Sequence, residues 1–170
     1  KKTAEEYDKD GWFHSGDIGQ FTADGVLQIV DRKKNLIKLK GGEYVAIEPM
    51  ENAFVQSPFC QVVCVIANGD LDGPLAIVRT DNEVLQEWAA ANKCDIQSPV
   101  ARKAVVQSMI KYGKEAGLSL LELRVKDCVL NTTVDWVPGN GMTATMKIDR
   151  KQIMTLHDTE IKEMLKRNGY

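Results

Sequence analysis

The sequence is poor in the residue types that most often build metal sites and acid–base sites. Its 170 residues include only two histidines, His14 and His157, and no two of its four cysteines have the CxxC spacing. A serine–histidine–carboxylate site would have to use one of these histidines, and the polar helical stretch around His157 predicts a surface residue. We therefore predict no metal site, and free thiols packed as small hydrophobic groups in a reducing, intracellular compartment.

The sequence also lacks an excess of charge and any long apolar run. The 22 basic and 24 acidic residues give a net charge of −2, which indicates neither nucleic acid nor a polyanionic partner. The longest apolar run, Val62–Ala67, is far shorter than the ~20 residues of a membrane-spanning helix. The chain opens with KKTAEEYDKDGW, without a methionine or a signal-peptide pattern, and we interpret it as a fragment of a longer protein.

What the sequence does contain is an ordinary globular composition with short, alternating apolar segments. Hydrophobic residues make up 44% and charged residues 27%, which suits one domain, or one domain with an arm. Two strands joined by the turn ADG predict a hairpin near the start. The predicted strands are Ile18–Thr22, Val26–Asp31, Leu36–Lys40, Cys60–Ala67, Leu75–Thr80 and Val125–Leu130. Within one strand, Cys60 and Cys64 should lie on the same face of the sheet.

Helices are predicted from apolar spacing and from capping residues. Thr80 and Glu83 predict a capping box for a helix that ends at Ala91. Ser98, followed by a proline, predicts the start of a longer helix that ends at Gly117. The remaining predictions are a helix over Ile47–Phe54, a long loop from Asn131 to Met146, and one or two helices over Asp149–Arg167.

Five residues stand out for their chemistry, although each has an ordinary structural alternative. The Asp17 carboxylate suits a pair of adjacent hydroxyls such as a ribose diol, or it is a solvated turn residue. The planar guanidinium of Arg32 suits phosphate, carboxylate or ribose oxygens, or it lies free on the surface. Gly41 and Gly42 allow the backbone to approach a ligand, or they form a plain turn. Lys147 follows the long loop and can deliver positive charge to a reacting centre.

Two sequence blocks together resemble a known family. GWFHSGDIG, followed closely by VDRKKNLIKLKGG, resembles the linker region of the adenylate-forming superfamily, which includes acyl-CoA synthetases, peptide-synthetase adenylation domains and firefly luciferase. The stretch GEYVAIEPMENAF is similar to the long-chain fatty acyl-CoA synthetase branch. The resemblance runs from Gly11 to the last predicted helices. It implies an α+β fold in which an N-terminal two-stranded hairpin and a hinge lead into a small mixed sheet flanked by helices.

The resemblance also implies a division of the chain and a nucleotide site. Residues 1–31 would form the linker and hairpin end of the N-terminal domain region, and residues 32–170 the small C-terminal domain, or lid. Asp17 matches the aspartate that holds the ribose hydroxyls of ATP, and Arg32 matches the arginine that reaches the ribose or phosphate side. Lys34 matches the hinge position, where backbone rotation swings the lid between two half-reactions.

A second group of residues matches the positions that serve the acyl and CoA substrates. Lys38, Gly41 and Gly42 match the region where the pantetheine arm of CoA passes. Lys147 resembles the lysine that the lid inserts during adenylation. The family's usual glycine immediately before this lysine is replaced here by Met146, in TATMKIDR.

The resemblance implies a C-terminal lid of a long-chain fatty acid–CoA ligase that uses ATP, Mg²⁺ and CoA. The serine-, threonine- and glycine-rich phosphate loop and the acyl pocket of such enzymes are not in this sequence, so we expect them, and most of the Mg²⁺ binding, in an N-terminal domain of the same protein. The chain alone should be inactive, and the parent enzyme should associate with an intracellular membrane through other parts. The alternatives are the lid of a medium-chain or aryl acid ligase, and a non-catalytic binding module with the same fold.

Overall fold

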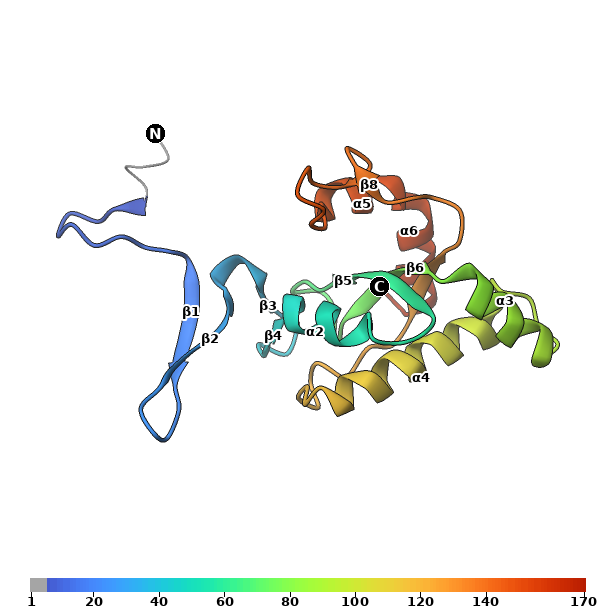
Figure 1. Ribbon diagram of the computed structural model, residues 1–170, viewed down its shortest axis with the longest axis horizontal. Helices are drawn as coiled ribbons and strands as arrows, with labels where there is room; N and C mark the ends of the chain where they lie inside the picture. Colours follow the sequence, from blue (N-terminus) through green and yellow to red (C-terminus); the bar gives the residue numbers. More distant parts are fainter. Residues whose placement is uncertain (1–5) are drawn as a thin grey trace.

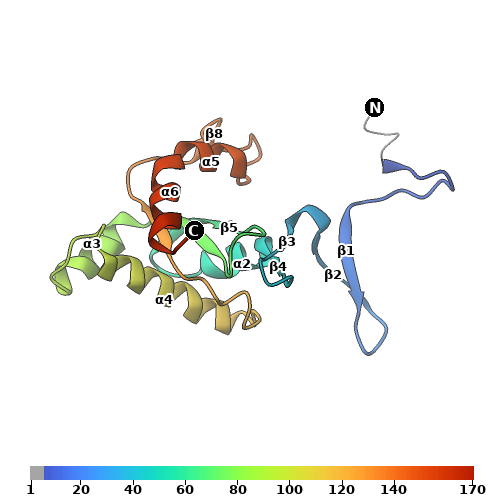
Figure 2. The ribbon, with the colours of Figure 1, turned by 180° about the vertical axis from the view of Figure 1, so that it is seen from behind.

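The computed structural model describes residues 6–170, which form an extended N-terminal arm and a larger α+β body (Figure 1). The arm contains β1 (Asp17–Phe21) and β2 (Leu27–Arg32), which pair antiparallel as predicted. A turn closes this hairpin, and in it the Thr22 N–H donates to the Val26 carbonyl at 2.9 Å. Figures 1 and 2 show the hairpin standing apart from the helices of the body, so most of its side chains are exposed.

A short segment connects the arm to the body. It contains the 3-10 turn η1 (Lys33–Asn35) and an antiparallel pair of strands, β3 (Leu36–Lys38) and β4 (Tyr44–Ala46). The strand predicted over Leu36–Lys40 therefore ends at Lys38. It ends there because the chain turns, with the Gly42 N–H donating to the Leu39 carbonyl at 2.9 Å.

The body is built on a mixed three-stranded sheet in the order β5–β6–β7. β5 (Cys60–Ile66) and β6 (Leu75–Thr80) are antiparallel, whereas β7 (Cys128–Asn131) runs parallel to β6. β7 starts later than the predicted strand at Val125, because its ladder with β6 begins with Ala76 opposite Cys128. The α+β class and the small mixed sheet are confirmed.

Helices cover both faces of this sheet. One face packs against α2 (Ile47–Phe54), α3 (Asn82–Ala91) and α4 (Pro99–Glu115) in the larger apolar core. The other face packs against α5 (Arg150–Leu156) and α6 (Asp158–Arg167), so the last predicted segment is two helices. The predicted long loop contains two short strands, β8 (Val137–Pro138) and β9 (Gly141–Met142). Within residues 6–170, no helix has the length and apolar character needed to cross a membrane.

One predicted helix cap is confirmed and the other is wrong. The Ser98 hydroxyl accepts from the Ala101 N–H at 3.2 Å and begins α4 as expected. At α3 the cap is Asp81, whose carboxylate accepts from the Val84 N–H at 3.2 Å. Thr80 does not cap this helix, because it is the last residue of β6 and its hydroxyl donates to a carbonyl of β7.

The two strand cysteines lie on opposite faces of the sheet, which corrects the sequence prediction. The register of β5 against β6 shifts between Cys60 and Val62, and such a bulge inverts the facing of the residues before it. Cys60 consequently packs in the α2–α4 core and Cys64 in the α5–α6 core. Burial raises the pKa of each of these thiols to about 12, so they are unreactive small hydrophobic groups.

Candidate functional site

The hairpin brings two of the predicted site residues together. Asp17 opens β1 and Arg32 closes β2, and the strand register places them opposite each other. The Arg32 Nε lies 3.5 Å from Asp17 Oδ1, and both side chains are partly exposed. A carboxylate and a guanidinium at the open end of one ribbon can therefore act on the same ligand.

The connecting segment is bound to α2 through the hydrogen bonds of Asn35, which the sequence analysis did not single out. The Asn35 side-chain amide donates to Asp31 Oδ1 and to Glu48 Oε2, both at 2.8 Å. Asp31 is buried and also accepts the Arg32 N–H at 2.6 Å. These contacts fix the orientation of η1, which contains Lys34, against the first turn of α2. Their only sequence signal is an Asp–Asn spacing of four, which many turns share.

Lys147 lies on a tight ribbon that follows β9. The Thr143 N–H donates to the Lys147 carbonyl at 2.8 Å, and the Lys147 N–H donates to the Thr143 hydroxyl at 3.1 Å. The turn between them places Met146 at φ +60°, in the left-handed region that favours glycine. The resemblance predicts a glycine at this position, and Met146 takes the left-handed conformation with its side chain 61% exposed.

The structure places Lys147 beside the connecting segment. One cavity of about 420 Å³ is lined by Arg32, Lys34 and Lys147, which come from two stretches that are far apart in the sequence. Four basic and two acidic side chains line it, so its net charge is +2 and it suits an anion. Arg32 and Glu48 also line a neighbouring cavity of about 340 Å³, which contains Asp17. Asp17, Arg32, Lys34 and Lys147 thus form one continuous candidate site.

The predicted CoA-binding residues form a second, separate surface. Lys38 ends β3, Gly41 and Gly42 lie on the β3–β4 connection, and none of the three lines the Lys147 cavity. Gly42 has φ +89°, and a Cβ added to it would meet only the Lys38 side chain, at 3.9 Å. A side chain there would therefore be strained by the backbone conformation, while the space over the glycine is open.

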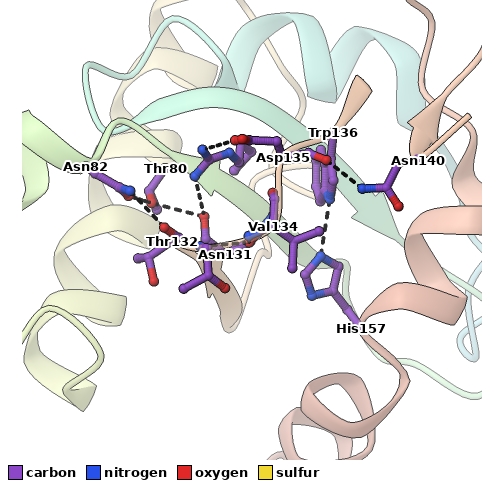
Figure 3. A network of polar contacts seen from close by, with 11 residues as sticks. Thr80, Asn82, Asn131, Thr132, Val134, Asp135, Trp136, Asn140 and His157 are labelled. Carbon is purple, nitrogen blue, oxygen red and sulfur yellow. Dashed lines mark hydrogen bonds and ion pairs between the residues drawn. The ribbon is translucent and has the colours of Figure 1, made fainter. Parts of the chain in front are cut away.

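A polar network holds the start of the loop that leads to Lys147. The network includes His157, for which the predicted surface position is wrong. His157 is 1% exposed, because the junction of α5 and α6 turns it towards Trp136. The Trp136 Nε1–H donates to His157 Nε2 at 3.2 Å (Figure 3). The polar helical surroundings gave no sign of this burial, because the indole that covers His157 is 21 residues away in the sequence.

The same network includes the first residues of the loop (Figure 3). The Asn131 side-chain amide donates to the Val134 carbonyl at 2.8 Å, and its oxygen accepts the Val134 N–H at 2.9 Å. The Asn140 amide donates to the Asp135 carbonyl at 2.8 Å. A stretch without periodicity is therefore held in one conformation by side chain–backbone hydrogen bonds.

The end of the loop is held by a half-buried ion pair, which the sequence analysis also missed. Arg150, the first residue of α5, donates to both oxygens of Glu51, at 2.6 and 3.1 Å. Burial raises the pKa of the Glu51 carboxyl, and the hydrogen bonds and charge of Arg150 oppose that rise. Both residues line the Lys147 cavity. The two side chains are 99 positions apart, so no local pattern could have predicted the pair.

Comparisons with known proteins agree with this geometry. No family model matches the chain. It is 37% identical over 170 residues to fatty acyl-CoA synthetase B of Dictyostelium discoideum, with 96% of this chain and 25% of the relative covered. It is 36% identical over 169 residues to long-chain-fatty-acid–CoA ligase 1 of Cavia porcellus, with 96% of this chain and 24% of the relative covered. The chain spans about a quarter of the length of these relatives.

Solved structures share the fold. The adenylation and carrier didomain of carboxylic acid reductase from Segniliparus rugosus, in complex with AMP, matches with a TM-score of 0.81 at 25% identity, over 96% of this chain and 22% of that one. The adenylation domain of a carboxylate reductase from Mycobacterium chelonae matches with a TM-score of 0.79 at 26% identity, over 96% of this chain and 24% of that one.

The fold and the arm therefore define the class of domain that forms part of the adenylation domains of adenylate-forming enzymes. Within that class, the chain belongs to the long-chain fatty acyl-CoA synthetase family and is a C-terminal domain of it.

Proposed function

We propose that this chain is the lid of an ATP-dependent long-chain fatty acid–CoA ligase, which forms acyl-CoA, AMP and pyrophosphate through an acyl-adenylate. Residues 1–31 would belong with the linker and the preceding domain, and residues 32–170 would form the lid; residues 1–5 lie outside the described part of the chain. The observation that carries the proposal is that one cationic cavity is lined by Arg32, Lys34 and Lys147 together.

The chemistry of adenylation needs such a site. A fatty carboxylate must attack the α-phosphate of ATP, and both groups are anions. An ammonium held between them offsets their repulsion and stabilises the charge that develops on the phosphorus in the transition state. Lys147 lies on a fixed ribbon at the edge of the cavity and would supply that ammonium. Asp17 would hold the ribose hydroxyls, and Arg32 beside it would reach the ribose or a phosphate.

Thioester formation would use the other surface. The pantetheine arm of CoA would pass Lys38, Gly41 and Gly42, where the space over Gly42 is open. Because this surface and the Lys147 cavity are separate, the lid would rotate at Lys34 to present each in turn. The contacts of Asn35 with Asp31 and Glu48 would hold the hinge in the orientation seen here.

The preceding adenylation domain would be the partner of this surface and would bind most of the Mg²⁺ that accompanies ATP. In the part of the chain that the structure describes, no group of three or more His, Cys, Asp or Glu side chains is placed to hold a metal ion. The free cysteines support an intracellular, reducing location, and membrane attachment would come from parts outside this sequence.

The proposal is tested with a full-length protein that contains this domain, supplied with ATP, Mg²⁺, CoA and a panel of long-chain, medium-chain and aromatic acids. We expect acyl-CoA and AMP with long-chain acids, and no AMP from the isolated chain. Turnover with medium-chain or aromatic acids alone would favour a ligase of another specificity. Binding of AMP without turnover of any acid would favour a non-catalytic binding module.

A further inference from the structure

The most completely bonded charged group in the body is the guanidinium of Arg150. Besides its two hydrogen bonds to Glu51, its Nη1 donates to the Val65 carbonyl at 2.9 Å and lies 3.2 Å from the Cys64 sulfur. Glu51 in turn accepts the Val65 N–H at 2.7 Å and is 8% exposed. The pair is thus held against the backbone of β5 from both sides.

The pair joins the two parts of the candidate site. Arg150 follows Lys147 by three positions, at the point where the lysine ribbon enters α5. Glu51 lies in α2, one turn after Glu48, which the connecting segment contacts through Asn35. A shift of either charged side chain would therefore change the distance between the lysine ribbon and the connecting segment.

We propose that Arg150 and Glu51 are a positioning pair that fixes where Lys147 stands relative to the connecting segment. The proposal rests on the proposed function of Lys147, and neither residue of the pair is assigned contact with substrate. Buried ion pairs can often be replaced by apolar side chains of similar volume without loss of stability. Apolar side chains cannot reproduce a two-pronged hydrogen-bond geometry, so stability and positioning can be separated by mutation.

The experiment compares Arg150→Met, Glu51→Leu, the double variant and Arg150→Lys in a full-length protein that contains this domain. Lys162→Met is the control, because Lys162 also forms a 2.6 Å ion pair, with Asp158, but on the exposed surface of α6. Four quantities are measured: the Tm, ATP–pyrophosphate exchange, thioester formation from pre-formed acyl-adenylate, and amide hydrogen exchange over residues 143–149.

We expect each single apolar variant to lower the Tm, because it leaves the partner charge unpaired and at least partly buried, and the double variant to regain more than half of that loss. Pyrophosphate exchange should stay about 10–100-fold slower in kcat for the double variant, as a small misplacement of a reacting group typically causes, with the KM for ATP within about twofold. Thioester formation should be nearly unchanged. Arg150→Lys keeps the positive charge but loses the two-pronged hydrogen bonding of the guanidinium. Its rate of pyrophosphate exchange should lie between those of wild type and Arg150→Met.

The hydrogen-exchange measurement separates this proposal from the proposed function. Amides of residues 143–149 should exchange faster in the double variant and stay unchanged in Lys162→Met. If that result is obtained while wild type catalyses no pyrophosphate exchange with any acid, the ligase function is wrong and the positioning role stands. If hydrogen exchange is unchanged, or if adenylation recovers together with the Tm in the double variant, the pair is only structural and the proposal is overturned.

Discussion

Two turns of the domain contain a left-handed residue close to a lysine, and they are built differently. In the β3–β4 connection the left-handed residue is Gly42, over which space is open. In the lysine ribbon it is Met146, whose side chain is largely exposed. Where a ligand must approach the backbone of a turn, the turn needs a glycine. Where a turn only presents the side chain of a neighbouring residue, it tolerates a larger residue. The difference fits a pantetheine passage at the first turn and a delivered ammonium at the second.

The two turns also differ in how they are anchored. The glycine turn is held mainly by backbone hydrogen bonds, such as the Lys40 N–H to the Leu71 carbonyl at 3.0 Å. The lysine ribbon and the loop before it are held by side chains, through the buried Trp136–His157 bond and the half-buried Arg150–Glu51 pair. Changes in the core should therefore disturb adenylation more readily than thioester formation.

Apart from Lys147→Ala, which is considered last, the largest effect on the rate of one half-reaction is expected from Gly42→Leu. A branched side chain would fill the open space over the turn and would be strained at φ +89°. We expect thioester formation from pre-formed adenylate to fall by about 100-fold, a typical consequence of misplacing a reacting group, while pyrophosphate exchange changes little. Single-turnover kinetics of the two half-reactions measures this directly.

Gly117→Leu is the matched control for the glycine turn. Gly117 has φ +81° and open space around its Cα, but it follows the end of α4 and belongs to neither turn. Gly117→Leu should introduce a similar backbone strain and leave the rates of both half-reactions unchanged. Equal losses in the two glycine variants would reduce Gly42 to an ordinary turn residue.

Asp17→Ala should give an intermediate effect that is common to both half-reactions. The loss of a charge-assisted contact to a ribose hydroxyl is worth about 1.5–3 kcal/mol, which is roughly 10–150-fold in affinity. The apparent affinity for ATP or AMP, measured by calorimetry, should fall by that factor. Asp24→Ala, on the exposed tip of the same hairpin, should have no effect. An unchanged nucleotide affinity for Asp17→Ala would remove this residue from the site.

The smallest effect is expected from Met146→Gly. Glycine relieves the left-handed strain, worth about 1–2 kcal/mol, but loses about 0.5–1 kcal/mol through the greater freedom of the unfolded chain. The free energy of unfolding should therefore rise by about 1 kcal/mol or less, and adenylation should change by less than about threefold. A change in adenylation of more than about tenfold would mean that the Met146 side chain itself serves the reaction.

Local patterns in the sequence predicted the elements whose determinants are local. The hairpin turn ADG, the helical spacing of Met50 and Phe54, and the Ser98 cap each act within a few residues, and the structure has each of them. The family motifs placed Asp17, Arg32, Lys34 and Lys147, which the fold then brings to adjoining cavities. The roles of these residues remain predictions.

What the sequence could not predict depends on distant partners. The facing of Cys60 is set by a bulge against β6, and Asp81 rather than Thr80 caps α3 because Thr80 is bonded to β7. The burial of His157 and the Arg150–Glu51 pair arise from residues that meet only in the folded chain. Periodicity describes one element at a time and contains no information on these contacts.

The central claim is that Lys147 acts in one half-reaction only, and Lys147→Ala tests it most directly. The ribbon is held by its backbone and by the Thr143 hydroxyl, so the domain should stay folded without this side chain. In a full-length protein that contains this domain, ATP–pyrophosphate exchange should fall on the order of 10²–10³, mainly in kcat, as removal of a preorganised electrostatic stabiliser typically causes. Thioester formation from pre-formed acyl-adenylate should continue at close to the normal rate. Equal losses in both half-reactions, or an unchanged pyrophosphate exchange, would contradict the account.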